Sequence, residues 1–433
     1  MVGILLLFIS LVFYLAKNRK WSILILIVFI NGGFSLFTLG MKGLDLVFVF
    51  SLLIALYSAF YEKEVKHEYK KLTNRVNMLL IFLLGSAFFS IFYYDFSILQ
   101  VLQGGRHLFN FIAYYFIIKT QKKDAVWVLD KLYLITLLTS ILYIIQVLSG
   151  LPVLIYGEAK VDASTGLGRY YNSPFYLPLF IYILALQPSL IKRPWKNLAL
   201  IILTLAQLLT LGRIEIATTL FMVLLGLLMK GDLGKIARIA IVCLMVAIPM
   251  LQTIGSRFDN EGNNTSELEQ IVKGDFMNIR EHHMGDATMV YRLAWVYERF
   301  YYLVHRPIGE QIFGLGMISD SQSDIVLRKY KFLNGLTNPE TDMPSQLTTP
   351  DISYGNFITQ FGFMGSIILL SVWGYVLIQS YRCRKENQYS FILCLLLLGY
   401  FLRSFSGAVI SNTANMIVPF LIYTLIPHNN LKK

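Results

Sequence analysis

The chain has 433 residues, of which 56% are hydrophobic and 15% are charged, and its mean hydropathy is +0.58. Soluble domains carry about 25% charged residues, so this composition excludes ordinary globular, disordered and fibrous proteins. The net charge of +12 does not by itself indicate nucleic-acid binding, because cytoplasmic loops of membrane proteins also collect Lys and Arg. The three cysteines are too few and too scattered for a disulfide framework or a zinc site. We therefore expect a polytopic membrane protein.

Apolar segments that could cross a bilayer recur along the chain. A crossing helix needs about 17–25 mainly apolar residues. The expected fold is therefore all-α, with about thirteen transmembrane helices, although twelve or fourteen would also fit because some neighbouring runs nearly touch. The predicted crossings are 1–16, 21–39, 44–61, 76–94, 101–118, 129–148, 174–191, 197–211, 215–229, 236–254, 355–380, 389–403 and 414–427.

Basic residues are distributed unevenly over the connections between these segments. Alternate connections hold 22 of the 38 Lys and Arg residues, beginning with Lys17, Arg19 and Lys20. Positive loops stay in the cytoplasm, so this pattern predicts an external N-terminus, a cytoplasmic C-terminus and an odd number of crossings. The first apolar run lacks a basic n-region and is expected to be a crossing rather than a cleaved signal peptide. The predicted organisation is ten helices in 1–254, a large external loop in 255–354, and three helices with a cytoplasmic C-terminus in 355–433.

The large external loop carries its own helical signal. Within DATMVYRLAWVYERFYYLVH, aromatic and small residues recur at helical spacing, and Pro307 follows to stop the helix. Aromatic side chains on such a helix suit a membrane interface. A connection of this length between membrane helices is usually functional, and we expect it to contain short helices.

Four arginines lie near the external ends of the predicted helices. Arg213 occupies a turn of a few residues between two apolar runs and is the strongest candidate for function. Its rigid, permanently charged guanidinium suits a phosphate or pyrophosphate group. The alternatives for Arg213 are a snorkelling anchor or a local pair with Glu215. The other three arginines are Arg106, Arg169 and Arg403.

No nucleotide-binding loop, zinc signature or nucleophile elbow is present in the sequence, and no internal repeat was found. We therefore expect no cofactor and no metal. The short motifs that remain surround the arginines. They are Thr210-Leu211-Gly212-Arg213, then Arg169-Tyr170-Tyr171-Asn172-Ser173-Pro174, then Arg292, Trp295, Pro307, Gly314 and Gly316, and finally Asp351, Tyr354, Gly362 and Gly365.

The order of these motifs, together with the topology, resembles the O-antigen polymerase and ligase superfamily, which includes Wzy-like polymerases and WaaL-related ligases. The resemblance covers roughly residues 100–400. Family members commonly have Ser-x-Ser-Arg in the tight turn, where this chain has Thr210 to Arg213. In the ligase branch a His-Asn pair closes the long loop, whereas this chain has Asp351 and Ile352 at those positions.

The resemblance implies roles for the candidate residues. Arg213 and Arg292 would hold a pyrophosphate, with Arg169, Arg106 and Arg403 in support, and Tyr170 and Tyr354 would flank the substrate. Asp351 would act as the base, or as the residue that orients the acceptor, if its pKa is pushed toward neutrality. The plainer interpretation is that Asp351 pairs with a loop arginine or caps the following helix. His282 and His283 are alternative bases, and Arg299 is expected to be a solvated or helix-face charge.

The implied activity is that of a metal-independent, inverting glycosyltransferase. It would join undecaprenyl-pyrophosphate-linked oligosaccharide repeat units at the outer, periplasmic face of a bacterial inner membrane. The expected partners are this lipid-linked donor, the bilayer, a chain-length regulator and a flippase, with no nucleic acid. The first alternative is an O-antigen ligase that transfers glycan to lipid A core or protein. A flippase or transporter is the second, and a membrane scaffold would leave the arginines and the loop motif unexplained.

Overall fold

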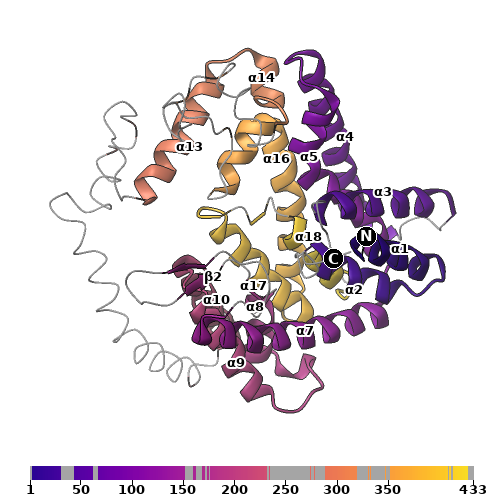
Figure 1. The fold of residues 1–433 in the computed structure, drawn as a ribbon, viewed down its shortest axis with the longest axis vertical. Helices are drawn as coiled ribbons and strands as arrows, with labels where there is room; N and C mark the ends of the chain where they lie inside the picture. The colour runs from indigo at the N-terminus through magenta and orange to yellow at the C-terminus, as the bar shows by residue number, and fades with distance from the viewer. Residues whose placement is uncertain are drawn as a thin grey trace.

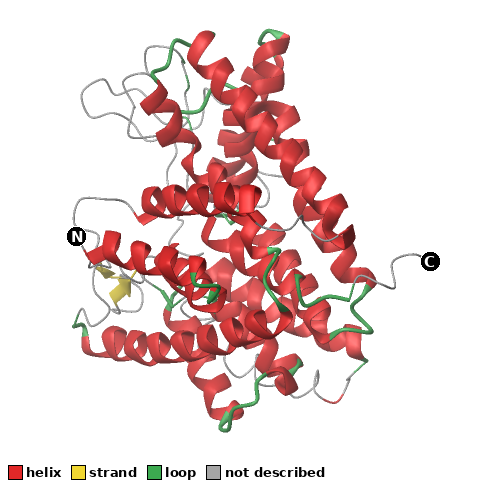
Figure 2. Cartoon of the chain, turned by 90° about the vertical axis from the view of Figure 1, so that its right-hand side faces the viewer, coloured by secondary structure: helices red, strands yellow, loops and turns green. Residues whose placement is uncertain are grey.

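A computed structural model of the chain describes residues 2–30, 43–61, 67–151, 159–161, 168–170, 173–174, 176–231, 234, 274, 277, 288–318, 330, 332, 347, 352–407, 409–410 and 413–427. The described part is helical except for one short pair of strands (Figure 2). The helices before the strands are α1 (Val2–Leu15), α2 (Arg19–Ile30), α3 (Gly43–Tyr61), α4 (Lys70–Phe92), α5 (Ile98–Phe109), α6 (Tyr114–Ile117) and α7 (Lys122–Ser149).

The strands β1 (Ala159–Val161) and β2 (Gly168–Tyr170) are antiparallel, with Lys160 opposite Arg169. The helices after them are α8 (Leu177–Leu186), α9 (Lys196–Leu209), α10 (Arg213–Lys230), α13 (Thr288–Val304), α14 (Ile308–Phe313), α16 (Ser353–Arg382), α17 (Gln388–Arg403) and α18 (Thr413–Tyr423). Short 3-10 turns cover His67–Tyr69, Asn110–Ala113 and Pro188–Leu190.

Three described helices, α4, α7 and α16, are long and apolar enough to cross a membrane. Shorter apolar helices include Ile4–Leu15, Phe48–Ser58, Leu177–Leu186, Lys196–Leu209 and Gln388–Arg403. The apolar helices and the composition together make this a helical membrane protein. Twelve of the thirteen expected crossings overlap described helices, but among the described residues only α4, α7 and α16 are long and apolar enough to cross a membrane, and the expected crossing at 236–254 lies outside the described residues.

Two of the expected crossings are interrupted. The range 101–118 is divided into α5, a 3-10 turn at Asn110–Ala113, and α6. The Asn110 side-chain amide donates to the Arg106 carbonyl oxygen at 3.0 Å, a local bond that competes with regular helix. The range 174–191 contains α8, which ends at Leu186 because Pro188 disfavours helical geometry at the preceding residue, Gln187.

The basic ends of the helices meet one another. Arg19 at the start of α2 donates to the Lys119 carbonyl oxygen at 3.1 Å, and the Lys119 ammonium is 2.7 Å from the Ser58 hydroxyl near the end of α3. Lys230 at the end of α10 donates to the Leu186 carbonyl at the end of α8. These contacts join connections that the charge pattern assigns to one face of the membrane.

The long helix α16 is the central element of the upper half of the molecule. It packs against α4, α13, α14 and α17, and Figure 1 shows α14 above α16 and beside the upper end of α4. Gly362 of α16 has a φ of +64°, and a Cβ there would lie 2.5 Å from the Gln311 and Ile312 carbonyl oxygens. Glycine at this kink therefore lets α14 approach the backbone of α16 directly.

Candidate functional site

The turn that carries Arg213 is as tight as the sequence predicts. Helix α9 ends at Leu209 and α10 begins at Arg213, so only Thr210, Leu211 and Gly212 connect them. Leu211 has a φ of +54°, in the left-handed region that costs an ordinary L-residue about 1 kcal/mol or more. The Thr210 hydroxyl bonds to the Gln207 carbonyl oxygen at 2.8 Å and holds this turn together. The turn thus fixes Arg213 as the first residue of α10, while its side chain lies outside the described part of the structure.

An ion pair joins the start of α10 to the end of α17. The Arg403 Nη2 atom is 2.9 Å from Oε1 of Glu215, and both side chains remain about one quarter exposed, at 23% and 25%. Glu215 lies in the first turn of α10 and Arg403 in the last turn of α17, where the helix dipoles favour an anion and a cation respectively. Sequence reasoning considered Glu215 only as a local partner of Arg213 and did not anticipate this contact.

The N-terminal end of α16 is fastened to the segment that follows Arg403. The Ser353 amide donates to the Ser404 carbonyl oxygen at 3.1 Å, and the Ser353 hydroxyl donates to the Gly407 carbonyl at 2.8 Å. The Tyr354 hydroxyl donates to the Phe401 carbonyl at 2.9 Å. Tyr354, a predicted site residue, therefore lies beside the end of α17 that carries Arg403.

Helix α13 covers the same end of α16. Trp295 is fully buried, and a Cβ placed on Gly355 would lie 2.6 Å from its ring. Arg292 precedes Trp295 by three residues and is partly exposed, so it lies on nearly the same face of α13, about one turn earlier. Tyr354 and the end of α17 that carries Arg403 thus lie at the start of α16, and Arg292 lies one helical turn before the Trp295–Gly355 contact. The expectation that aromatics of this helix face a membrane interface does not hold for Trp295, which packs against protein.

Arg299 corrects a sequence-based expectation. The sequence predicts a solvated or helix-face charge, yet the exposed fraction of Arg299 is 0%. Its guanidinium stacks 3.6 Å from the Phe332 ring centroid and 4.6 Å from that of Trp295, and it pairs with Glu298. Aromatic faces and a carboxylate offset the desolvation of a buried guanidinium. Arg299 therefore holds the loop at Phe332 against α13.

A second ion pair lies at the start of α14, and its carboxylate reaches the end of α4 through a tyrosine. The Arg306 guanidinium makes two bonds to the Glu310 carboxylate, at 2.7 and 3.0 Å, and Glu310 is buried. The Tyr93 hydroxyl, just after α4, donates to Glu310 at 3.1 Å, and this bond raises the pKa of Tyr93 above its ordinary value. Hydrogen bonding to Glu310 likewise raises the pKa of Arg306. Nearby, the Tyr94 hydroxyl donates to the Gly314 carbonyl at 3.1 Å, and burial raises the pKa of Tyr94.

The remaining predicted residues lie in different places. Tyr170 is buried, and its carbonyl oxygen accepts from the Tyr143 hydroxyl at 3.3 Å, so its role in the described structure is packing at the end of α7. Arg169 belongs to β2, and its side chain lies outside the described residues. Arg106 belongs to α5, which Figure 1 shows on the opposite side of the molecule from α10. Asp351, His282 and His283 all lie outside the described residues.

Among the described residues, no group of three His, Cys, Asp or Glu side chains is placed to hold a metal ion. No protein-family model and no curated protein sequence matches this chain. The site therefore has to be interpreted from its own chemistry. It consists of two arginines, a carboxylate and a tyrosine that four helices bring to one end of the bundle, beside the turn that carries Arg213.

Proposed function

We propose that the chain is a polysaccharide polymerase of the O-antigen type. It joins lipid-linked oligosaccharide repeat units at the outer face of a bacterial cytoplasmic membrane, which it crosses about thirteen times. The observation that carries the proposal is the convergence of the α9–α10 turn, the end of α17, the start of α16 and the start of α13. Each of these four segments contributes a residue that the sequence motifs single out.

A cationic cluster of this kind suits a pyrophosphate leaving group. Arg213 begins α10, and Arg403 is paired at 2.9 Å with Glu215 in the first turn of the same helix, so two arginines belong to neighbouring helix ends. Arginine binds phosphate oxygens in a bidentate manner and stays charged at every physiological pH. The start of a helix adds backbone N–H groups that favour anions. Arg292 would approach the same anion from α13.

The proposed reaction is a single displacement. The acceptor hydroxyl oxygen attacks the anomeric carbon of the donor sugar, and the bond from that carbon to the pyrophosphate oxygen breaks. Asp351 takes the hydroxyl proton, and the polyprenyl pyrophosphate departs with its charge held by the arginines. Attack opposite to the leaving group inverts the anomeric configuration. This scheme needs no metal, because the cations that stabilise the leaving group are side chains.

The arrangement of helix ends also supports the proposed orientation. Arg19, Lys119 and Lys230 contact other helix ends that the charge pattern assigns to the cytoplasm. The Arg403–Glu215 contact joins two ends that the same pattern assigns to the outside. When successive helices cross a membrane in alternating directions, helix ends on the same side of the membrane contact one another.

The test compares single variants in cells whose surface polysaccharide is resolved on a gel. R213A and D351A should abolish the long-chain ladder while one repeat unit still reaches lipid A core. The control is R384A. Arg384 lies at the opposite end of the bundle, where its guanidinium donates to the Tyr381 carbonyl. At matched membrane expression this variant should keep the ladder. An unchanged ladder in both test variants would refute the site. Loss of all attached glycan with accumulation of lipid-linked polymer would instead identify a ligase.

Glu215 is proposed as a positioning residue, and its test separates binding from chemistry. In E215Q, Arg403 loses its fixed partner but remains charged, so KM for the lipid-linked donor should rise severalfold with kcat nearly retained. R403K keeps the charge but loses the planar fork and should show the same pattern. Purified protein in liposomes must form glycosidic bonds; lipid movement without bond formation would identify a flippase.

A further inference from the structure

A cavity of about 670 Å³ lies at the opposite end of the molecule from the arginine site. It is an open pocket bordered by the first turns of α7, the end of α8, the connection from α8 to α9, and the first turn of α17. Tyr389 on its wall and Arg403 belong to the same helix, fourteen positions apart, so roughly 21 Å of α17 separates the cavity from the arginine site. The cavity therefore has no part in the proposed transfer reaction.

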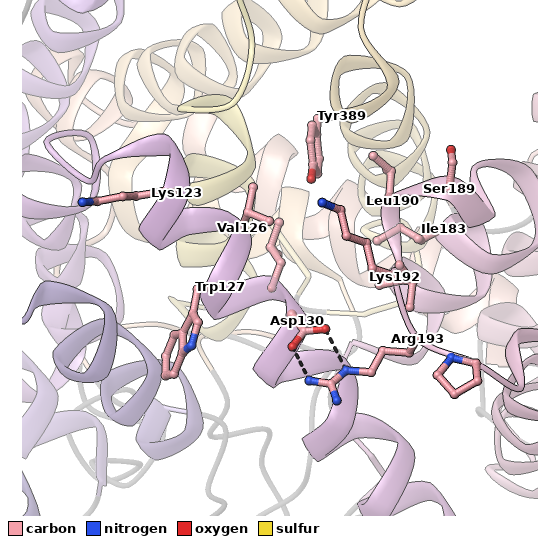
Figure 3. Close-up of a pocket in the computed structure, with 13 residues that line it drawn as sticks. Lys123, Val126, Trp127, Asp130, Ile183, Ser189, Leu190, Lys192, Arg193 and Tyr389 are labelled. Atoms are coloured by element: carbon pink, nitrogen blue, oxygen red, sulfur yellow. Dashed lines mark hydrogen bonds and ion pairs between the residues drawn. The ribbon is translucent and has the colours of Figure 1, made fainter.

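The charged residues of the cavity are unequally neutralised. Arg193 is held by a bidentate contact with Asp130, at 3.0 and 2.6 Å. Lys192 and Lys123 also line the cavity, and neither has an ion-pair partner among the described residues. Figure 3 shows the Lys192 ammonium directed toward Tyr389, with Lys123 at the far edge and extending away. The cavity thus has a net excess of positive charge beside a fixed Arg193–Asp130 pair.

The rest of the wall is apolar and braced. Val126, Leu129 and Ile183 supply aliphatic surface, and Trp127 supplies an aromatic one. The Trp127 ring meets Trp21 edge-on at 4.8 Å, and the Lys20 ammonium lies 5.2 Å from its centroid. Tryptophan and tyrosine beside lysines are typical of the interface between headgroups and acyl chains. The wall therefore combines a cationic rim with a surface suited to hydrocarbon.

We propose that this cavity binds an anionic phospholipid, with the headgroup phosphate on Lys192 and an acyl chain along the Val126–Leu129 wall. A free phosphate or nucleotide would use the cations but gain nothing from the aliphatic wall. Basic pockets between membrane helices on the cytoplasmic side are suited to anionic headgroups. The bound lipid would brace the connection from α8 to α9, which reaches α17 through the Ser189–Gln388 hydrogen bond at 3.1 Å.

The test uses the full-length protein purified in neutral detergent, with dioleoyl phosphatidylglycerol, dioleoyl phosphatidylcholine and inorganic phosphate as separate probes. Binding is measured by native mass spectrometry and by the shift of the melting temperature. Phosphatidylglycerol should bind and raise the melting temperature, and phosphatidylcholine and phosphate should not. K123Q/K192Q should weaken phosphatidylglycerol binding about tenfold or more, because each lysine near an anionic surface contributes measurably.

The matched control is K17Q/K385Q, which removes two exposed lysines from the same predicted face but outside the cavity. It should bind phosphatidylglycerol as the unchanged protein does. Equal weakening in both double variants would show general surface attraction and overturn the proposal. If inorganic phosphate raised the melting temperature as much as phosphatidylglycerol does, the cavity would be a site for soluble anions, and the proposal would be overturned. If K123Q/K192Q purifies poorly, the salt dependence of binding to the unchanged protein decides: affinity that is insensitive to salt contradicts a phosphate held by Lys192 at a lysine-bordered rim.

Discussion

In the Arg306–Glu310 pair, we expect replacement of the arginine to reduce stability more than replacement of the glutamate. Glu310 is 1% exposed, whereas Arg306 is 38% exposed. Replacing Arg306 by Gln leaves a buried carboxylate that still accepts a hydrogen bond from the Tyr93 hydroxyl but has lost its charged partner, and uncompensated burial of a charge costs about 3–5 kcal/mol. Replacing Glu310 by Gln leaves a guanidinium that water can reach, so only about 1–2 kcal/mol is expected.

The expected order of stability is therefore unchanged protein, then E310Q, then R306Q. R306K keeps the charge but loses the two-pronged contact, and it should fall between the unchanged protein and R306Q. The free energy of unfolding is measured by denaturing-detergent titration in mixed micelles, followed by tryptophan fluorescence. Backbone hydrogen exchange over 308–313 locates the effect, because the pair fastens α14 to α4 through Tyr93.

The result that would refute this reasoning is E310Q being as destabilising as R306Q, or more so. That outcome would mean that solvent reaches Glu310 when Arg306 is absent, or that the Tyr93 hydrogen bond carries most of the energy. Y93F decides between these two explanations, because it removes the hydroxyl and leaves the ion pair intact. Loss of one hydrogen bond to a charged group should cost about 1.5–3 kcal/mol at most.

Two further predictions concern backbone approach and pH. G362A should lower the free energy of unfolding by at least about 2 kcal/mol. The backbone at residue 362 is in the left-handed region, and a Cβ there would lie 2.5 Å from backbone oxygens of α14. G374A on the same helix has open space around its Cβ and should be neutral or stabilising by about 0.5–1 kcal/mol. Both are measured by the same titration, and equal effects would contradict the packing argument. Burial raises the pKa of Tyr94, so above pH 10 the unfolded chain releases a proton that the folded chain retains, and stability falls as pH rises. Melting temperatures followed from pH 8 to 11 should therefore fall less steeply for Y94F, and parallel curves would show that Tyr94 does not contribute.

The loop between α10 and α16 has a structural role that constrains any catalytic one. Its described part contacts the rest of the bundle at two places: Trp295 of α13 packs against Gly355 of α16, and Glu310 of α14 accepts a hydrogen bond from the Tyr93 hydroxyl just after α4. Gly314 has a φ of +83°, and its Cβ would lie 2.4 Å from the Gln360 carbonyl, so the Gly-x-Gly segment serves close backbone packing. Arg292 belongs to α13, and the packing of this helix against α16 defines the position of the Arg292 backbone.

The sequence by itself determined the class of protein and most of the helices. Apolar length and the distribution of basic residues are local properties, so α4, α7 and α16 could be predicted without knowledge of any tertiary contact. The three-residue turn before Arg213 and the end of α13 ahead of Pro307 were also predictable, because helix ends are marked by local residue chemistry.

Only the tertiary structure decided which charges meet. Glu215 pairs with Arg403, which belongs to a helix much later in the chain. Arg299 has the sequence context of a surface charge but is buried between Trp295 and Phe332. Neither fact leaves a periodic signal, because a side chain's partner depends on which helix ends the packing of the bundle brings together. The candidate site therefore follows from the packing around the start of α16, and the sequence supplied only its members.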